Sequence, residues 1–159
     1  MAATKQANKE APFTIIVDTR EKRSYKFDGF DTVVKGLKTG DYSIVGLEDR
    51  VAVERKSFND AWGSMSSGRE RFTRCIKRLA ELDRAAIVIE CSLTELSIPP
   101  RQIQRVSPAS VVGGFISWSA QYAIPVFFCD NALLAERVTL RFLAAYWKHR
   151  SGLYVKGTK

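Results

Sequence analysis

Histidine and cysteine are scarce in this sequence of 159 residues, and their scarcity narrows the chemistry that the chain can perform. His149 is the single histidine, so a Ser/His or Cys/His catalytic triad and a histidine-rich metal site are both disfavoured. It lies in a basic stretch, where we interpret it as a helix-end residue rather than a base. The three cysteines, Cys75, Cys91 and Cys129, are far apart and odd in number, which fits neither a disulfide framework nor a zinc site. We interpret them as small buried hydrophobic residues in a reducing compartment.

Long apolar runs are also missing. No segment is long and apolar enough to cross a bilayer. Residues 1–12 contain lysines but no apolar core, so they do not form a signal peptide. We therefore expect an intracellular protein, in the cytoplasm or the nucleoid, that has no membrane partner.

Positive charge is in excess. Lysine and arginine together number 25 against 17 acidic residues, which gives a formal net charge of +8 and a pI near 9.6. This balance favours an anionic partner, with nucleic acid first and a membrane surface second. Hydrophobic residues make up 45% of the chain, which argues against disorder and suits one domain with a full-sized core.

The hydrophobic pattern predicts strands first, and then helices that alternate with strands. Short β-branched runs predict strands at 13–18, twice within 32–46, and at 50–56, 85–90 and 125–130. Helical spacing and capping residues predict a short helix after Ser57 and further helices over 69–82, 107–122 and 131–150. We expect an antiparallel meander from the first strands and, over residues 13–150, an α/β domain with a mixed central sheet flanked by helices. Residues 1–12 and 151–159 are expected to be tails.

Two of the expected helices have an unusual composition. Gly113 and Gly114 lie inside the helix over 107–122, at a cost of about 1 kcal/mol each relative to alanine. A close approach by another backbone would explain them. The final helix is apolar around much of its circumference, which fits either a dimer contact or a helix wedged into a single core.

Acidic residues gather at the ends of the predicted strands. Asp18 and Glu21 follow the first strand, Asp41 precedes a later one, and Glu54 and Lys56 end the next, two residues apart and so on one face. If these strands are neighbours, the carboxylates converge at one edge of the sheet, which is unfavourable unless a positive charge lies between them. Oxygen ligands without histidine or cysteine select Mg²⁺ or Mn²⁺ over zinc. A lysine on the same face could neutralise charge that develops on a phosphate, so the pattern indicates phosphodiester hydrolysis.

Several ordered motifs extend this pattern. Gly40-Asp41-Tyr42 is followed by Glu54-Arg55-Lys56-Ser57 and then by Asp60, while VDTRE stands upstream at 17–21 and SGRERFTRCIKRL downstream at 67–79. Together they resemble the signature of the XPF family of structure-specific endonucleases, which includes archaeal Hef. The resemblance covers roughly residues 13–148.

The resemblance implies a restriction-endonuclease-like nuclease domain that dimerises through its last helices and cleaves branched DNA, such as flaps, forks and bubbles, with Mg²⁺ or Mn²⁺. By motif position, Glu21, Asp41 and Glu54 would be metal ligands, and the carbonyl of Arg55 could join them. Lys56 would be the catalytic lysine.

The surrounding charged residues would support the site. The supporting residues implied by the resemblance are Asp18, Arg20, Arg55 and Asp60. Strand alternation turns the Arg55 side chain to the opposite face, where it could form a salt bridge or contact a phosphate. Arg20 could pair with a carboxylate or a phosphate, and Asp60 could simply complete a capping box. Arg69 and Arg71 could contact DNA phosphates or form a solvated basic face.

Other functions stay open on the sequence alone. Many members of the resembled family carry a helix-hairpin-helix domain after the nuclease domain, and some carry a helicase before it. Only residues 151–159 follow the expected domain here, so we expect that such a module is absent or that another chain supplies it. The alternatives to a flap or fork endonuclease are a four-way-junction resolvase, another nuclease on the same fold, or a non-catalytic DNA-binding scaffold subunit.

Overall fold

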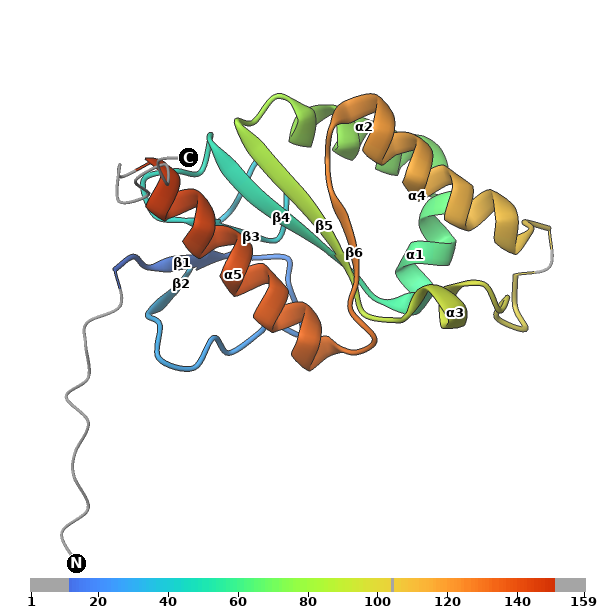
Figure 1. Cartoon of the computed structure of the whole chain (residues 1–159), viewed down its shortest axis with the longest axis horizontal. Helices are drawn as coiled ribbons and strands as arrows, with labels where there is room; N and C mark the ends of the chain where they lie inside the picture. The colour runs from blue at the N-terminus through green and yellow to red at the C-terminus, as the bar shows by residue number, and fades with distance from the viewer. Residues whose placement is uncertain (1–11, 104, 151–159) are drawn as a thin grey trace, which may run out of the picture.

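A six-stranded mixed sheet runs through the computed structural model, which describes residues 12–103 and 105–150 (Figure 1). The strands lie in the order β2-β1-β3-β4-β5-β6. Their bounds are β1 Ile15–Val17, β2 Thr32–Val34, β3 Tyr42–Ile44, β4 Val51–Lys56, β5 Arg84–Ile89 and β6 Val126–Phe128. Only β3 runs antiparallel to its neighbours, and the other adjacent pairs are parallel. The expected α/β class, with a mixed sheet flanked by helices, is confirmed.

Helices cover the two faces of this sheet (Figure 1). They are α1 Phe58–Met65, α2 Arg69–Ala80, α3 Leu93–Leu96, α4 Pro108–Tyr122 and α5 Ala132–Arg150. Helices α1, α2 and α4 share one apolar core with Ala52 of β4, whereas α5 shares the other core with Val51 and Val53. Because β4 alternates in this way, it contributes to both cores and lies at the centre of the fold.

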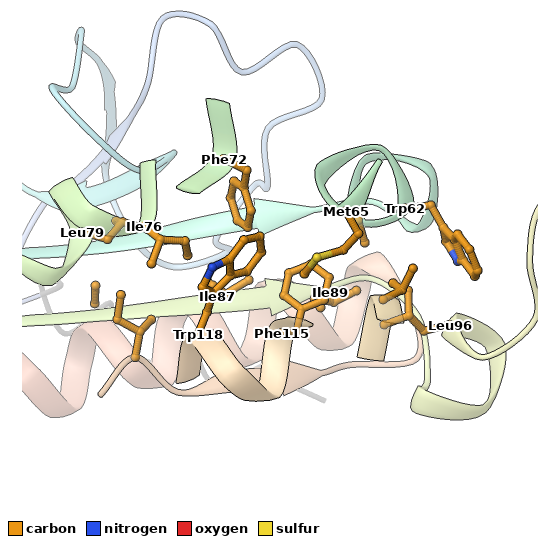
Figure 2. Close-up of a cluster of buried hydrophobic side chains, with 14 of the residues drawn as sticks. Trp62, Met65, Phe72, Ile76, Leu79, Ile87, Ile89, Leu96, Phe115 and Trp118 are labelled. Carbon is orange, nitrogen blue, oxygen red and sulfur yellow. The ribbon is translucent and has the colours of Figure 1, made fainter. Parts of the chain in front are cut away.

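The core beneath α1, α2 and α4 is built largely from aromatic and branched side chains (Figure 2). Phe72 and Trp118 lie edge to face with ring centroids 5.2 Å apart, and Phe115 packs against both. Phe72 thereby fixes α2 against the sheet next to the end of β4, where the predicted site lies. No helix among residues 12–103 and 105–150 is long and apolar enough to span a membrane.

The expected antiparallel meander is wrong at one strand. β2 pairs in parallel with β1 at the outer edge of the sheet, and β3 takes the other side of β1. The long connection over 18–31 gives the chain enough length to return and run in the same direction, which a tight turn cannot do. The side chains of β2 are exposed, so its apolar sequence did not distinguish an edge strand from a buried one.

A short helix was absent from the sequence expectations. In α3, the Ser92 hydroxyl accepts a hydrogen bond from the Glu95 N–H, and the Glu95 carboxylate accepts one from the Ser92 N–H. This reciprocal pair is a capping box, and its Ser-x-x-Glu spacing was a usable signal. The tails expected at 1–12 and 151–159 lie outside the described residues, apart from Pro12.

Helix α5 packs along the core that contains Val51. Its buried residues Ala135, Thr139 and Leu143 recur every four positions and so lie along one stripe. Leu133 is exposed at the start of the helix. This packing accounts for part of the broad apolar surface, and the dimer contact stays a prediction.

The two adjacent glycines of α4 differ in their surroundings. A Cβ added at Gly114 would lie 2.5 Å from Met65 Sδ, whereas one added at Gly113 would meet nothing within 4 Å. The close neighbour is therefore a buried side chain of α1, not the backbone that the sequence led us to expect, and only Gly114 needs to be small.

We predict that Gly113→Ala and Gly114→Ala change stability in opposite directions. Alanine at position 113 gains helix propensity, worth about 0.5–1 kcal/mol. Alanine at position 114 overpacks the core against Met65, which costs about 1–3 kcal/mol and outweighs the same gain. Urea denaturation of both variants measures the difference, and equal stabilisation by both would contradict the described packing.

Candidate active site

A basic cleft of about 390 Å³ lies where β4 ends and α2 crosses it. Five of the predicted site residues line it together: Asp41, Glu54, Lys56, Arg20 and Arg71. The other lining residues are Lys38, Thr39, Gly40, Ser64, Phe72, Cys75 and Arg78. Side chains from separate parts of the sequence thus form one cavity with carboxylates at its floor and cations around it.

A tight passage of the chain places Asp41. Gly40 has a φ of +80°, and a Cβ added there would lie 2.7 Å from Ala52 Cβ, so only glycine fits this approach to β4. The Asp41 N–H donates to the Val53 carbonyl at 2.9 Å, and the Arg55 N–H donates to Asp41 Oδ2 at 2.7 Å. The Asp41 carboxylate therefore accepts the hydrogen bond from β4 that a backbone carbonyl of a neighbouring strand would otherwise accept, just before β3 begins.

Glu54 and Lys56 extend from the same face of β4. Lys56 Nζ lies 3.2 Å from Glu54 Oε1 and 4.1 Å from the centroid of the Phe72 ring. The Cys75 thiol donates to Glu54 Oε2 at 3.6 Å. Both oxygens of Glu54 are thus engaged, and the ammonium group of Lys56 is held between a carboxylate and an aromatic face.

Burial and like charge perturb the acids of the cleft. Burial first, and then the negative charge of Glu54, raises the pKa of Asp41 to about 8, although the hydrogen bond from the Arg55 N–H opposes the shift. Burial and the same Glu54 charge raise the pKa of Cys75 to about 12, so its thiol stays protonated and can donate. The two carboxylates share a space in which ionising both is costly without a cation.

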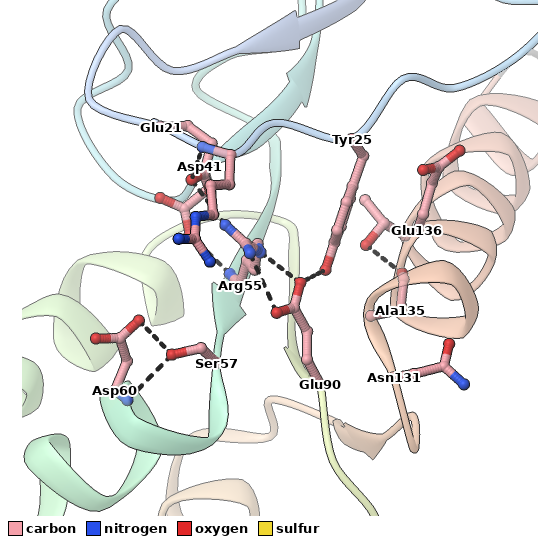
Figure 3. Close-up of polar contacts among 12 residues, drawn as sticks. Glu21, Tyr25, Asp41, Arg55, Ser57, Asp60, Glu90, Asn131, Ala135 and Glu136 are labelled. Atoms are coloured by element: carbon pink, nitrogen blue, oxygen red, sulfur yellow. Dashed lines mark hydrogen bonds and ion pairs between the residues drawn. The ribbon is translucent and has the colours of Figure 1, made fainter.

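Arg55 faces away from the cleft, as strand alternation predicted. Behind β4 its guanidinium contacts Glu90 at 2.5 Å and Glu21 at 2.8 Å, and it lies over the Tyr25 ring (Figure 3). The structure therefore places Glu21 in an ion pair with Arg55 and not on the cleft lining. This is the main difference from the arrangement that the motifs suggested.

Asp18 braces the loop that carries Glu21. It is buried, and it accepts hydrogen bonds from Arg20 Nε at 2.6 Å and from the Leu37 N–H at 2.6 Å. Burial alone would raise the pKa of Asp18, but the bonds from Arg20 and Leu37 outweigh burial and lower the pKa. Arg20 is thereby held at the cleft rim, so its pairing with a carboxylate is observed, and its contact with a phosphate stays a prediction.

The remaining predicted residues take different positions. Asp60 lies at the start of α1, where its N–H donates to the Ser57 hydroxyl and its Oδ2 accepts from the same hydroxyl at 2.7 Å. Ser57 thus caps α1, but the Asp60 carboxylate binds the Ser57 hydroxyl and not the Ser57 N–H that a capping box requires. Arg71 lines the cleft, whereas Arg69 lies over the Trp118 ring, 5.7 Å from its centroid, on another side of α2.

Several residues of the site were missed from sequence. Arg78 lies two helical turns after Arg71 and lines the same cleft, so the helical period was a usable signal. Glu90 follows β5, and its N–H donates to the Lys56 carbonyl at 2.8 Å, which places it beside Arg55. Its role depended on the pairing of β4 with β5, which the sequence pattern did not specify.

The donor set fits a hard divalent cation in its chemistry. Asp41 and Glu54 supply carboxylate oxygens. Burial first, and then the negative charge of Glu54, raises the pKa of Asp41, and a bound cation would offset both effects. Among residues 12–103 and 105–150, no three His, Cys, Asp or Glu side chains come close enough to hold a metal ion by themselves. A complete coordination shell would therefore need further oxygen atoms from the backbone, water or DNA.

Comparisons with known proteins identify the family and the fold of this chain. Residues 17–142 match the family described as the ERCC4 domain. One relative, "Putative ATP-dependent RNA helicase MJ1505" of Methanocaldococcus jannaschii, is 29% identical over 123 residues, which cover 76% of this chain and only 14% of that protein. The chain thus spans a small part of this relative.

Two solved structures share the fold. XPF from Aeropyrum pernix has a TM-score of 0.68 and 24% identity, covering 88% of this chain and 68% of that chain. A structure of the same Aeropyrum pernix protein in complex with DNA has a TM-score of 0.61 and 26% identity, covering 84% of this chain and 66% of that chain.

We predict that Asp41→Asn alters how stability depends on pH when divalent ions are removed with EDTA. Because the pKa of Asp41 is raised in the folded chain, its contribution to stability is fully present below its unfolded pKa and is lost as the pH rises through about 8. The free energy of unfolding of Asp41→Asn, relative to wild type, should therefore increase by about 1 kcal/mol or more from pH 5 to pH 8. Urea denaturation measures it.

The matched control is Asp28→Asn, at an exposed position of the loop over 18–31. It should follow the wild-type profile. A constant difference between Asp41→Asn and wild type across this pH range would show that Asp41 does not carry the raised pKa.

Proposed function

This chain belongs to the ERCC4 domain family, and we propose that it is a metal-dependent DNA endonuclease that hydrolyses phosphodiester bonds near single-strand/double-strand junctions. The substrates would be flaps, forks or other branched DNA that arise in repair, recombination or replication. The observation that carries the proposal is the convergence of Asp41, Glu54 and Lys56 in one basic cleft.

Carboxylates at the floor of the cleft would hold the cation. We assign this role to Asp41 and Glu54, with the carbonyl of Arg55. Glu21 does not line the cleft and its Oε1 binds Arg55, so it would join through its second oxygen only after its side chain turns toward the cleft. When bound, Mg²⁺ or Mn²⁺ supplies Lewis-acid polarisation of a phosphoryl oxygen and lowers the pKa of water at the site. Asp18 keeps the Glu21 loop in place through Leu37, and Asp60 with Ser57 holds α1 against the end of β4.

Lys56 would act on the scissile phosphate. Its ammonium group is restrained by Glu54 and by the face of Phe72, so little rearrangement is needed to present positive charge to the cleft. That charge would stabilise the additional negative charge on the phosphate in the transition state and orient the attacking water. In-line attack by water would leave a 5′-phosphate and a 3′-hydroxyl.

Cations around the cleft would bind the DNA backbone. Arg20, Lys38, Arg71 and Arg78 line it with exposed side chains, and a phosphate is their natural partner. Arg69 would contact the strand beyond the cleft. The related Aeropyrum pernix structure in complex with DNA supports this reading.

Partners complete the proposal. We infer a homodimer that forms through the C-terminal helices, where Leu133 of α5 and Phe127 of β6 are exposed apolar residues. A separate chain with a helix-hairpin-helix or helicase module would select the DNA structure. A panel of flap, fork, four-way and linear substrates separates this function from that of a resolvase.

We predict that Lys56→Ala and Asp41→Ala each lower the rate of cleavage of an end-labelled flap substrate by at least about 10²-fold. Neither residue is among the four cations assigned to the DNA backbone, which stay in place in both variants, so the affinity for DNA should change little. Single-turnover cleavage in Mn²⁺ and a DNA-binding titration in EDTA measure the two effects.

Lys35→Ala and Asp28→Ala are the matched controls, because both residues are exposed and neither lines the cleft. They should cleave as wild type does. Wild-type rates in Lys56→Ala and Asp41→Ala would refute the assignment, and an inactive wild type that still binds DNA would favour a scaffold subunit.

A further inference from the structure

A series of part-buried polar contacts lies behind the cleft, on the opposite face of β4 (Figure 3). The Tyr25 hydroxyl donates to Glu90 Oε1 at 2.7 Å. Arg55 donates to both oxygens of Glu90, through Nε at 2.5 Å and Nη2 at 3.1 Å, and through Nη1 to Glu21 Oε1 at 2.8 Å. Four side chains are thus linked in the order Tyr25, Glu90, Arg55, Glu21.

The same arginine contacts two of the proposed metal ligands by different groups. Its guanidinium binds Glu21, and its backbone N–H donates to Asp41 Oδ2 at 2.7 Å. A shift of Arg55 that moves both its guanidinium and its backbone therefore affects the carboxylates of both Glu21 and Asp41. The position of this one residue couples the two sides of β4.

The position of Glu90, within this series of contacts, is set by its backbone. It directly follows β5, and its N–H donates to the Lys56 carbonyl at 2.8 Å, so its backbone is attached to the strand that carries the site. Tyr25 is itself held by stacking on Tyr42, at 4.9 Å between ring centroids and 8° between planes. Tyr25 is therefore restrained by packing, and Arg55 lies over the ring of this same tyrosine.

Burial and charge explain what Glu90 does. The side chains of Arg55, Glu21 and Glu90 are 14%, 10% and 10% exposed, so water compensates little of their charge. Arg55 already binds Oε1 of Glu21 at 2.8 Å. Without the charge of Glu90, Glu21 would be its remaining anionic partner, and the guanidinium would be free to turn and bind the second oxygen of Glu21 as well. A fixed cation at Glu21 competes with a divalent ion for the same oxygen atoms.

We propose that Glu90 is a positioning residue of the candidate site: it anchors the guanidinium of Arg55 so that Glu21 and Asp41 stay available to a divalent cation. This inference rests on the proposed function. Glu90 touches neither the cleft nor the substrate, and it acts through Arg55, as partners behind a ligand commonly orient that ligand.

The test compares Glu90→Gln with Glu136→Gln. Glu136 of α5 also supports the loop over 18–31, accepting the Phe27 N–H at 3.1 Å, but it has no contact with Arg55 (Figure 3). Mn²⁺ binding to the whole chain is measured by the loss of the free-ion electron paramagnetic resonance signal. We expect Glu90→Gln to weaken Mn²⁺ binding by about 10-fold or more and Glu136→Gln to leave it within about 2-fold of wild type. Equal affinities in wild type and Glu90→Gln would overturn the proposal.

Tyr25→Phe changes no charged residue, and it replaces Glu90→Gln as the test variant if Glu90→Gln does not fold. It removes the hydrogen bond to Glu90 and should weaken Mn²⁺ binding in the same direction by about 2- to 5-fold, a smaller loss than removal of the carboxylate charge causes. Unchanged binding in a folded Tyr25→Phe would count against the series of contacts.

A readout without metal separates this inference from the proposed function. The Arg55 amide is protected by Asp41, so its hydrogen exchange in EDTA should accelerate in Glu90→Gln or Tyr25→Phe but not in Glu136→Gln. If wild type binds no Mn²⁺ while this pattern holds, the metal function fails and the positioning by Glu90 stands. An unchanged Arg55 exchange rate in both variants would overturn the positioning itself.

Discussion

The pleat of β4 separates three consecutive charged residues onto two faces of the sheet, and the candidate site depends on that separation. Glu54 and Lys56 extend into the cleft, while Arg55 between them extends to the opposite face and binds Glu21 and Glu90. If all three side chains lay on one face, Arg55 would pair with the Glu54 carboxylate and neutralise its charge in the cleft. Alternation keeps one acid and one lysine for the cleft and assigns the arginine to the support behind it.

Packing then fixes the position of this strand. Ala52 lies in the core under α1 and α2, and Val51 and Val53 lie in the core under α5, so β4 is held from both sides. Gly40 lets the chain approach Ala52 closely, which brings Asp41 to the end of the same strand. Stability and the proposed chemistry thus share the same residues, and the raised pKa of Asp41 records the cost of placing an acid there.

Much of this arrangement could be predicted from sequence, because period and capping are local signals. The strand of Val51 and Val53, the helix with Phe72 and Ile76, and the cap at Ser57 all followed from spacing. The opposite orientation of the Arg55 side chain also followed from alternation alone. Parallel pairing of β2 with β1 did not, because a short exposed strand carries no signal for its neighbour or direction.

Contacts between distant segments were the part that sequence could not supply. The ion pair of Glu21 with Arg55 and the position of Glu90 depend on which strands are adjacent, and the motifs gave residue types without side-chain directions. The most direct test of the account is a crystal of the chain soaked in Mn²⁺ and measured at a wavelength where manganese scatters anomalously. The account predicts an anomalous peak within coordination distance of the Asp41 and Glu54 carboxylates, and a map with no peak there at saturating Mn²⁺ would contradict it.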